Sequence, residues 1–134
     1  MQTAPPNFES SSNSAAGKSS TGLDANVAAL LAYLFSWVSG LIFLVVEKES
    51  RFVRFHAMQS VLLGAAAMLC VFGLSVITSM MAFISLTAAV VFSSLGSLIA
   101  LAFFAVTIFC MIKAYQGQQF RLPIIGDIAA RTAN

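Results

Sequence analysis

The feature that most constrains this chain is a stretch of 58 residues, Phe55 to Ile112, that contains no Asp, Glu, Lys or Arg. As one helix it would be about 87 Å long, whereas the hydrocarbon core of a bilayer is about 30 Å thick. Two spans of about 20 residues leave room for a connection, while three leave almost none. We therefore expect the stretch to cross a membrane twice, at about residues 56–79 and 93–114.

The overall composition also favours a membrane protein over a soluble domain. The chain of 134 residues is 59% hydrophobic and 9% charged, against about 45–50% and about 25% in soluble domains. Twelve charged side chains are too few to cover so much apolar surface in water. The formal net charge of +2 gives no sign of the dense basic patch that a nucleic-acid partner requires. The sequence predicts an all-α integral membrane protein.

A second uncharged run, residues 27–46, is long enough for one further span. Thr21 and Asp24 precede it with the spacing of a capping box, which predicts the start of a helix. Residues 1–22 are rich in Ser, Asn, Pro and Ala, with Phe8 as their one large apolar side chain, so we expect a disordered tail. The helical membrane domain then covers residues 23–134.

Basic residues flank the long uncharged stretch on both sides, and positive loops favour the cytoplasm. Both ends of the stretch should therefore face the cytoplasm. Three spans then place the N-terminus outside and the C-terminus inside the cytoplasmic membrane. The connection at residues 80–94 leaves open a loop, a re-entrant helix or part of a fourth span. The flanking basic residues are Lys48, Arg51 and Arg54 before the stretch and Lys113, Arg121 and Arg131 after it.

The segment after the last span is expected to be amphipathic and to fold back along the membrane surface. Lys113 in a last helical turn and Gly117 beyond it indicate a helix end, and Pro123 prevents simple continuation. Apolar side chains then lie among polar ones, which is typical of an interfacial segment. These apolar residues are Phe120, Leu122, Ile124, Ile125 and Ile128.

Few residues in the sequence could carry chemistry. His56 is the only histidine, and no other His, Cys or carboxylate stands at metal-ligand spacing from it. No nucleophile motif accompanies it. A proton-coupled pair of His56 and Asp127 is a less favoured alternative. Cys70 and Cys110 lie at different depths of the expected spans, so we expect both to be reduced and unpaired. We expect a non-enzymatic protein without metal or cofactor.

Polar residues near the inner membrane surface form a candidate set of contacts. Basic side chains there attract anionic lipid head groups. Glu47 stands four residues before Arg51, which would neutralise part of that charge. His56 and Gln59 share one helix face. The candidates for contact with lipid or a partner are Arg51, Arg54, His56, Gln59, Lys113, Arg121 and Asp127.

Small residues four positions apart would let another helix approach closely. They motivate the leading hypothesis, in which the protein associates with copies of itself or with other membrane proteins. The alternative is a small oligomeric channel or carrier for ions or small solutes, lined by hydroxyls such as Ser75, Thr78 and Ser97. Such hydroxyls more often bond to their own helix backbone. The candidate packing residues are Ala28, Ala32, Ser36, Gly40, Ser60, Gly64, Gly96 and Ala100.

Two blocks of the chain resemble a known family. They are residues 23–60, LDANVAALLAYLFSWVSGLIFLVVEKESRFVRFHAMQS, and residues 111–129, MIKAYQGQQFRLPIIGDIA. They are similar to the Tic-twenty-like family of small prokaryotic membrane proteins, which is related to a component of the chloroplast inner-envelope import machinery. The resemblance implies three or four helical spans and a role in membrane protein assembly or translocation. It implies no catalytic residue.

Overall fold

The computed structural model describes residues 17–132, and over this range the chain is all-helical, without a β-strand. Most of the expected disordered tail, residues 1–16, lies outside the described residues, as do residues 133–134. The helices within the range are α2 (Ala25–Leu34), α3 (Trp37–Val46), α4 (Arg51–Ala82), α5 (Leu86–Tyr115) and α6 (Ile125–Thr132).

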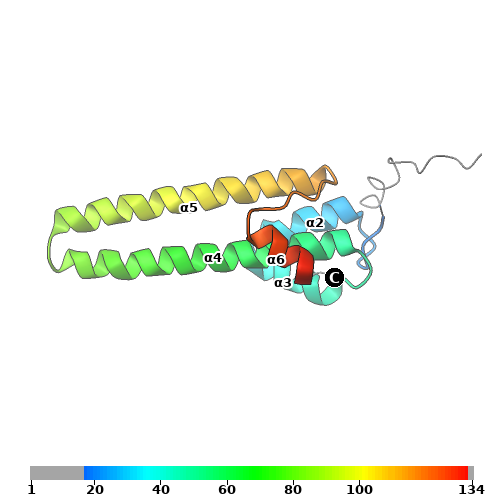
Figure 1. The fold of residues 1–134 in the computed structure, drawn as a ribbon, viewed down its shortest axis with the longest axis horizontal. Coiled ribbons are helices and arrows are strands. Elements are labelled where there is room, and N and C mark those ends of the chain that lie inside the picture. Colours follow the sequence, from blue (N-terminus) through cyan, green and yellow to red (C-terminus); the bar gives the residue numbers. More distant parts are fainter. Residues whose placement is uncertain (1–16, 133–134) are drawn as a thin grey trace, which may run out of the picture.

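Helices α4 and α5 form one long antiparallel hairpin (Figure 1). With 32 and 30 residues they are about 48 and 45 Å long, close to the full bilayer thickness of about 40–45 Å with its head groups. Both are long and apolar enough to cross a membrane. The two spans expected here are therefore present as helices that extend beyond the predicted limits.

The connection between these helices is shorter than expected. Only residues 83–85 lie between α4 and α5, and the Ser85 hydroxyl caps α5 by accepting a 3.4 Å hydrogen bond from the backbone N–H of Ala88. Of the three alternatives that the sequence left open at residues 80–94, the structure shows a loop, but one of residues 83–85 alone, and the rest of the range belongs to α4 and α5. In a stretch without charges nothing draws the chain into water, and continuing the helices satisfies nearly all backbone groups.

The expected continuous span at residues 27–46 is also wrong. The chain bends at Phe35 and Ser36, where Ser36 has a φ of 56°, and α3 turns back beside α2 (Figure 1). Each of these helices has 10 residues and is about 15 Å long, which is half the hydrocarbon thickness. The run therefore forms a shallow hairpin in place of a third span.

Serine side chains satisfy the backbone at this bend, which is required in a membrane interior. The Ser39 hydroxyl accepts a 3.1 Å bond from the Phe35 N–H and donates a 2.9 Å bond to the Ala32 carbonyl. The Ser60 hydroxyl of α4 donates a 2.9 Å bond to the Ser36 carbonyl. These bonds replace those lost where the helix is interrupted, so an uncharged run can fold back on itself.

Both helical hairpins start and end at the same end of the molecule. The start of α2 packs with the start of α4 and the end of α5, in a core that contains Ala25, Phe52, Val53 and Ala114. Residues 17–24, which precede α2, therefore lie at the same end of the molecule as the segment that follows α5 and leads to α6. The expectation that the N-terminal and C-terminal segments flank opposite ends of the spans does not hold from residue 17 onward.

Apart from Ala89 of α5, the buried residues gather at this end. We call it the broad end, and it consists of α2, α3, α6 and the parts of α4 and α5 that touch them. In α4, which the structure describes in full, every buried residue lies between Phe52 and Gly64. Helix α6 packs on α4 through Ala129 and Phe55, as the fold-back of the C-terminal segment requires. We call residues 70–103 the narrow end, and of the residues 17–132 it contains only parts of α4 and α5 and the turn that joins them (Figure 1).

Candidate functional site

A buried carboxylate closes the shallow hairpin at its base. Glu47 is 1% exposed, and its carboxylate accepts hydrogen bonds from the Ser20 N–H at 3.0 Å, the Ser20 hydroxyl at 2.7 Å and the Ser50 N–H at 2.9 Å. It also accepts one from the Ser19 hydroxyl. Residues 19 and 20, expected in a disordered tail, are thus fixed to the start of α4.

The hydrogen bonds determine the ionisation of Glu47. Desolvation by burial alone would raise its pKa, but the bonds from Ser19, Ser50 and Ser20 outweigh this effect and lower the pKa to about 2. The carboxylate is therefore ionised at neutral pH and is held by uncharged donors. The expected pairing of Glu47 with Arg51 is not what stabilises it.

A second polar cluster lies in the core of the broad end and joins α2, α4 and α5 to the segment before α6. Gln59 and His56 are both fully buried, and Tyr33 is 1% exposed. The Gln59 amide donates 3.1 Å bonds to the Tyr33 hydroxyl and to the Phe120 carbonyl. Its nitrogen also lies 3.7 Å from the sulfur of Cys110. One side chain thus links four segments of the chain.

His56 is held by aromatic rings and one hydrogen bond. The Tyr33 oxygen lies 3.1 Å from His56 Nδ1, and because this hydroxyl accepts from Gln59, its own proton is free to donate to Nδ1. The rings of Phe52 and Phe55 meet the imidazole edge-on, at 4.6 and 5.2 Å between centroids. His56 and Gln59 are therefore core residues, and the expectation that they contact lipid or a partner at the surface is wrong for these two.

The remaining candidate contact residues lie at or near the surface of the broad end. Lys113 donates a 3.0 Å bond to the Gln118 side chain and lies 5.5 Å from the centroid of the Phe109 ring. Arg54 is half-buried. The exposed members of the set are Arg51, Arg121 and Asp127.

Most of the candidate packing residues are used inside the molecule. A Cβ added at Gly40 would lie 2.8 Å from the Ala57 carbonyl oxygen, and one at Gly64 would lie 2.7 Å from the Cβ of Trp37. These two glycines let α3 and α4 approach closely. Ala28, Ala32 and Ser60 are buried beside them, and Ser36 forms the bend. Gly96 and Ala100 instead lie on the narrow end, where Gly96 has only an ordinary contact with Leu74.

A hydroxyl-lined cleft of about 380 Å³ lies between α4 and α5 at the narrow end. Several of its hydroxyls donate to their own helix, as Ser75 does to the Val71 carbonyl and Ser79 to the Ser75 carbonyl, both at 2.8 Å. Gly96 and Ala100 also line it. Its remaining polar lining comes from Thr78, Ser93 and Ser97.

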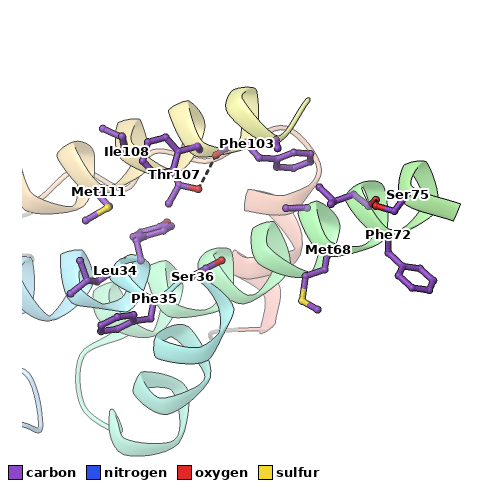
Figure 2. A pocket seen from close by; sticks show the side chains of 15 residues that line it. Leu34, Phe35, Ser36, Met68, Phe72, Ser75, Phe103, Thr107, Ile108 and Met111 are labelled. Carbon is purple, nitrogen blue, oxygen red and sulfur yellow. Dashed lines mark hydrogen bonds between the residues drawn. The ribbon is translucent and has the colours of Figure 1, made fainter. Parts of the chain in front are cut away.

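A larger apolar groove of about 850 Å³ lies beside the bend of the shallow hairpin. Figure 2 shows Leu34, Phe35 and Ser36 of the bend opposite Met111 of α5, with Met68 on α4. Its one hydrogen bond drawn joins the Thr107 hydroxyl to the Phe103 carbonyl at 2.9 Å. The groove marks the level at which the molecule changes from the broad to the narrow end.

The sequence analysis missed the Glu47 clamp and the Gln59 network. Glu47 was expected to neutralise part of the charge of Arg51, whereas its carboxylate accepts hydrogen bonds from the hydroxyls of Ser19 and Ser20. Within residues 17–132, no group of three His, Cys, Asp or Glu side chains could hold a metal ion. Both cysteines are free in the structure, Cys70 exposed and Cys110 buried, as expected.

Comparison with known proteins overturns the expected family. Residues 21–129 match the magnetosome magnetite crystal formation protein family. A UPF0132 membrane protein of Methanocaldococcus jannaschii is 45% identical over 113 residues, which cover 84% of this chain and 92% of that protein. A UPF0132 membrane protein of Archaeoglobus fulgidus is 38% identical over 104 residues, 78% of this chain and 90% of that protein. No solved structure matches the chain.

The resemblance to the Tic-twenty-like family is therefore wrong. The blocks at residues 23–60 and 111–129 both fall within the region, residues 21–129, that matches the other family. Small apolar helical proteins share long uncharged runs flanked by basic residues, and those features alone do not separate one family from another. The role in protein import that the resemblance implied has no support.

Proposed function

This chain belongs to the magnetosome magnetite crystal formation protein family, and from that premise we propose that it is a non-enzymatic membrane protein that works by helix–helix association with copies of itself. The family's description concerns mineral formation, whereas the features of this chain that support a function lie in its membrane helices. The UPF0132 relatives are likewise named membrane proteins.

The observation that carries the proposal is the hydroxyl-lined cleft of the narrow end. Ser75, Ser79, Gly96 and Ala100 form a surface of small side chains between α4 and α5, and no other helix of residues 17–132 covers it. Lipid tails gain little by contact with such a surface, but a second helix can approach it closely. A second copy offers the same surface and would make a symmetric contact.

The hydroxyls favour a protein partner over lipid for a second reason. Three of them donate hydrogen bonds to backbone carbonyls in the preceding turn of their own helix. They belong to Ser75, Ser79 and Ser97. Each oxygen keeps lone pairs that can accept a bond from another helix. Such bonds between membrane helices contribute about 0.6–2 kcal/mol each. Packing and these bonds together would hold two copies.

We propose that the broad end faces the cytoplasm. It contains Arg51, Lys113 and Arg121, and basic residues concentrate on the cytoplasmic side of membranes. The same side chains would lie near the head groups and attract anionic lipids, each by about 1 kcal/mol. Residues 17–24 and 116–132 then share the cytoplasmic side.

Disulfide cross-linking in the native membrane tests the association. The variant Ser79→Cys is made in a Cys70→Ser background, because Cys70 is itself exposed, whereas Cys110 is buried and can stay. Mild oxidation should convert a large share of Ser79→Cys to a disulfide-linked dimer. The matched control is Gly73→Cys, on the same helix, where an added Cβ meets nothing within 4 Å and which does not line the cleft.

Dimer formation by Ser79→Cys well above that of Gly73→Cys supports the proposal. Equal cross-linking of the two variants would indicate random collision, and absence of a dimer from both would refute self-association. As a second measurement, Ser75→Leu should lower the share of oligomer in native extracts, because the larger side chain fills the cleft.

A small oligomeric channel or carrier is a second candidate, supported by the same cleft. Facing copies could place the hydroxyls of Ser79, Ser93 and Ser97 along one polar path. Liposome flux distinguishes the two functions. A path lined by these residues should be blocked by Ser79→Leu, whereas an association role predicts no flux in the unmodified protein.

A further inference from the structure

We propose that this protein senses and promotes membrane curvature, because it is a wedge that occupies more area in one leaflet than in the other. Within residues 17–132, four helices lie together at the broad end, and α6 packs against one of them, α4. At the narrow end only α4 and α5 remain in this range (Figure 1). The inference does not depend on self-association or on the direction in which the protein faces.

The depth of the shallow hairpin confines it to one leaflet. Its bend meets α4 at Gly64, where a Cβ would lie 2.7 Å from Ser36 Oγ. From Arg51 to Gly64 the helix rises about 20 Å, and from Gly64 to the turn at Phe83 it rises about 28 Å. With a hydrocarbon core of about 30 Å, the bend lies near the middle of the bilayer when the charged base of the hairpin lies at the head groups.

The outer face of the shallow hairpin belongs in lipid. Leu41, Ile42 and Val45 of α3 are 50%, 56% and 69% exposed, and Leu34 and Phe35 project at the bend. Between Ala25 and Val46 no residue is charged. Side chains of this kind must be covered by hydrocarbon. The hairpin therefore displaces lipid in the leaflet next to the charged base, and not in the other leaflet.

The C-terminal helix increases the difference between the leaflets. Helix α6 buries Ala129 against α4 and exposes Asp127 and Arg131, so it carries an apolar and a charged side, as interfacial helices do. Gly126 permits the close approach of α6 to the segment that precedes it, since a Cβ there would lie 2.7 Å from the Cα of Arg121. The helix thus lies on α4 within the broad end.

The extra area can be estimated from helix dimensions. A helix with its side chains is about 10–12 Å across, so α2 and α3 together add on the order of 200 Å² to one leaflet. A membrane relieves this difference by bending so that the leaflet at the broad end lies on the convex side. The protein should accordingly concentrate where that leaflet is convex, and at high density it should drive such bending.

The test uses full-length protein reconstituted at low density in giant vesicles of phosphatidylcholine and phosphatidylglycerol. A fluorescent label at Lys18→Cys, in a Cys70→Ser background, reports the side of the broad end, because an impermeant quencher separates the two orientations. Narrow tubes are pulled from the vesicles, and protein density in the tube is compared with that in the vesicle. The outer leaflet of a tube is convex.

Whether the protein is enriched in tubes or depleted from them should depend on its orientation. Protein with its broad end outside should be enriched in tubes, increasingly so as the tube narrows, and protein with its broad end inside should be depleted. Equal density in tube and vesicle for both orientations would overturn the proposal, as would enrichment that ignores orientation. This arm substitutes only two exposed side chains, Lys18 and Cys70, and circular dichroism checks that the labelled protein keeps its helical content. Low density keeps self-association out of the readout.

A variant locates the effect in the shallow hairpin. Gly40→Leu should push α3 away from α4, given the 2.8 Å approach to Ala57, and should reduce the difference between the two orientations. Gly73→Leu, in open space on α4, is the matched control and should sort as the unmodified protein does. If Gly40→Leu folds, as judged by its helical circular dichroism, and sorts unchanged, the wedge is not made by α2 and α3.

Discussion

Gln59 and Phe120 are 61 residues apart in the chain, yet the Gln59 side-chain amide donates a 3.1 Å hydrogen bond to the Phe120 carbonyl. The same amide donates to the Tyr33 hydroxyl of α2. One fully buried side chain on α4 therefore holds the segment that leads to α6 and the first arm of the shallow hairpin. The broad end depends on this polar link within an otherwise apolar core.

Removing this amide should loosen the C-terminal segment. In Gln59→Leu the Phe120 carbonyl loses the side-chain amide that donates to it, and an unsatisfied buried polar group costs about 1–3 kcal/mol. We expect a lower midpoint of thermal unfolding in detergent and faster hydrogen exchange in residues 120–126. Gln118→Leu, whose exposed side chain accepts a bond from Lys113 at the surface, is the control and should change neither. Unchanged exchange in Gln59→Leu would show that the link is not needed.

Glu47 makes stability depend on pH in the acid range. Its pKa is lowered from 4.5 to about 2 in the folded protein, so the unfolded chain binds a proton more readily than the folded one. The stabilisation is therefore fully present above about pH 4.5 and is lost as the pH falls toward 2. Thermal unfolding in detergent between pH 7 and pH 3 should show a falling midpoint.

The matched variants separate Glu47 from the other carboxylates. Glu47→Gln should lower the midpoint at pH 7 and flatten its fall in acid, because the neutral amide places hydrogens against the donors of Ser20 and Ser50. Glu49→Gln, which alters an exposed side chain, should leave the profile as it is. If the unfolding midpoint of Glu47→Gln still falls in acid as steeply as that of the unmodified protein, another group causes the acid sensitivity.

A side chain larger than that of glycine at position 64 should destabilise the protein, because α4 contacts the bend closely there. In Gly64→Ala the new methyl group would lie 2.7 Å from Ser36 Oγ and from Trp37 Cβ, and overpacking of this kind costs about 1–3 kcal/mol. Gly73→Ala on the same helix meets open space and should be neutral or slightly stabilising. Thermal unfolding of both variants checks the pair, and equal midpoints would contradict the close approach.

The two cysteines should differ in reactivity. Cys70 is exposed and Cys110 is fully buried, next to the Gln59 amide. A membrane-permeant maleimide should label Cys70, which faces lipid, slowly in the native protein, and it should reach Cys110 only after denaturation. Mass spectrometry counts the labels. Rapid labelling of Cys110 in the folded protein would mean that the core of the broad end is open.

The sequence predicted the long spans well because their signal is simple. An uncharged stretch from Phe55 to Ile112 with basic residues at both ends has few other solutions in a bilayer. The limits of the helices were harder to place, since apolar turn residues such as Phe83 and Ile84 look like the helices that they join.

The shallow hairpin and the site residues were not predictable in the same way. Residues 27–46 have the length and the polarity of a span, and the bend depends on bonds from Ser39 and from Ser60, which lies on another helix. Likewise, Glu47 and Gln59 acquire their roles from partners 28 and 61 residues away. The hydropathy of a segment predicts whether it lies in lipid or in water. It does not predict which distant residues form hydrogen bonds with it.

The measurement that tests the account most directly is a three-point accessibility experiment in right-side-out and inverted membrane vesicles. Lys18→Cys, Ser85→Cys and Arg131→Cys are each made in a Cys70→Ser background and treated with an impermeant maleimide. Because the shallow hairpin returns to its own side, Lys18→Cys and Arg131→Cys should be labelled from the same side, and Ser85→Cys from the other. Labelling of Lys18→Cys and Arg131→Cys from opposite sides would mean that residues 27–46 cross the membrane, and would contradict the fold described above.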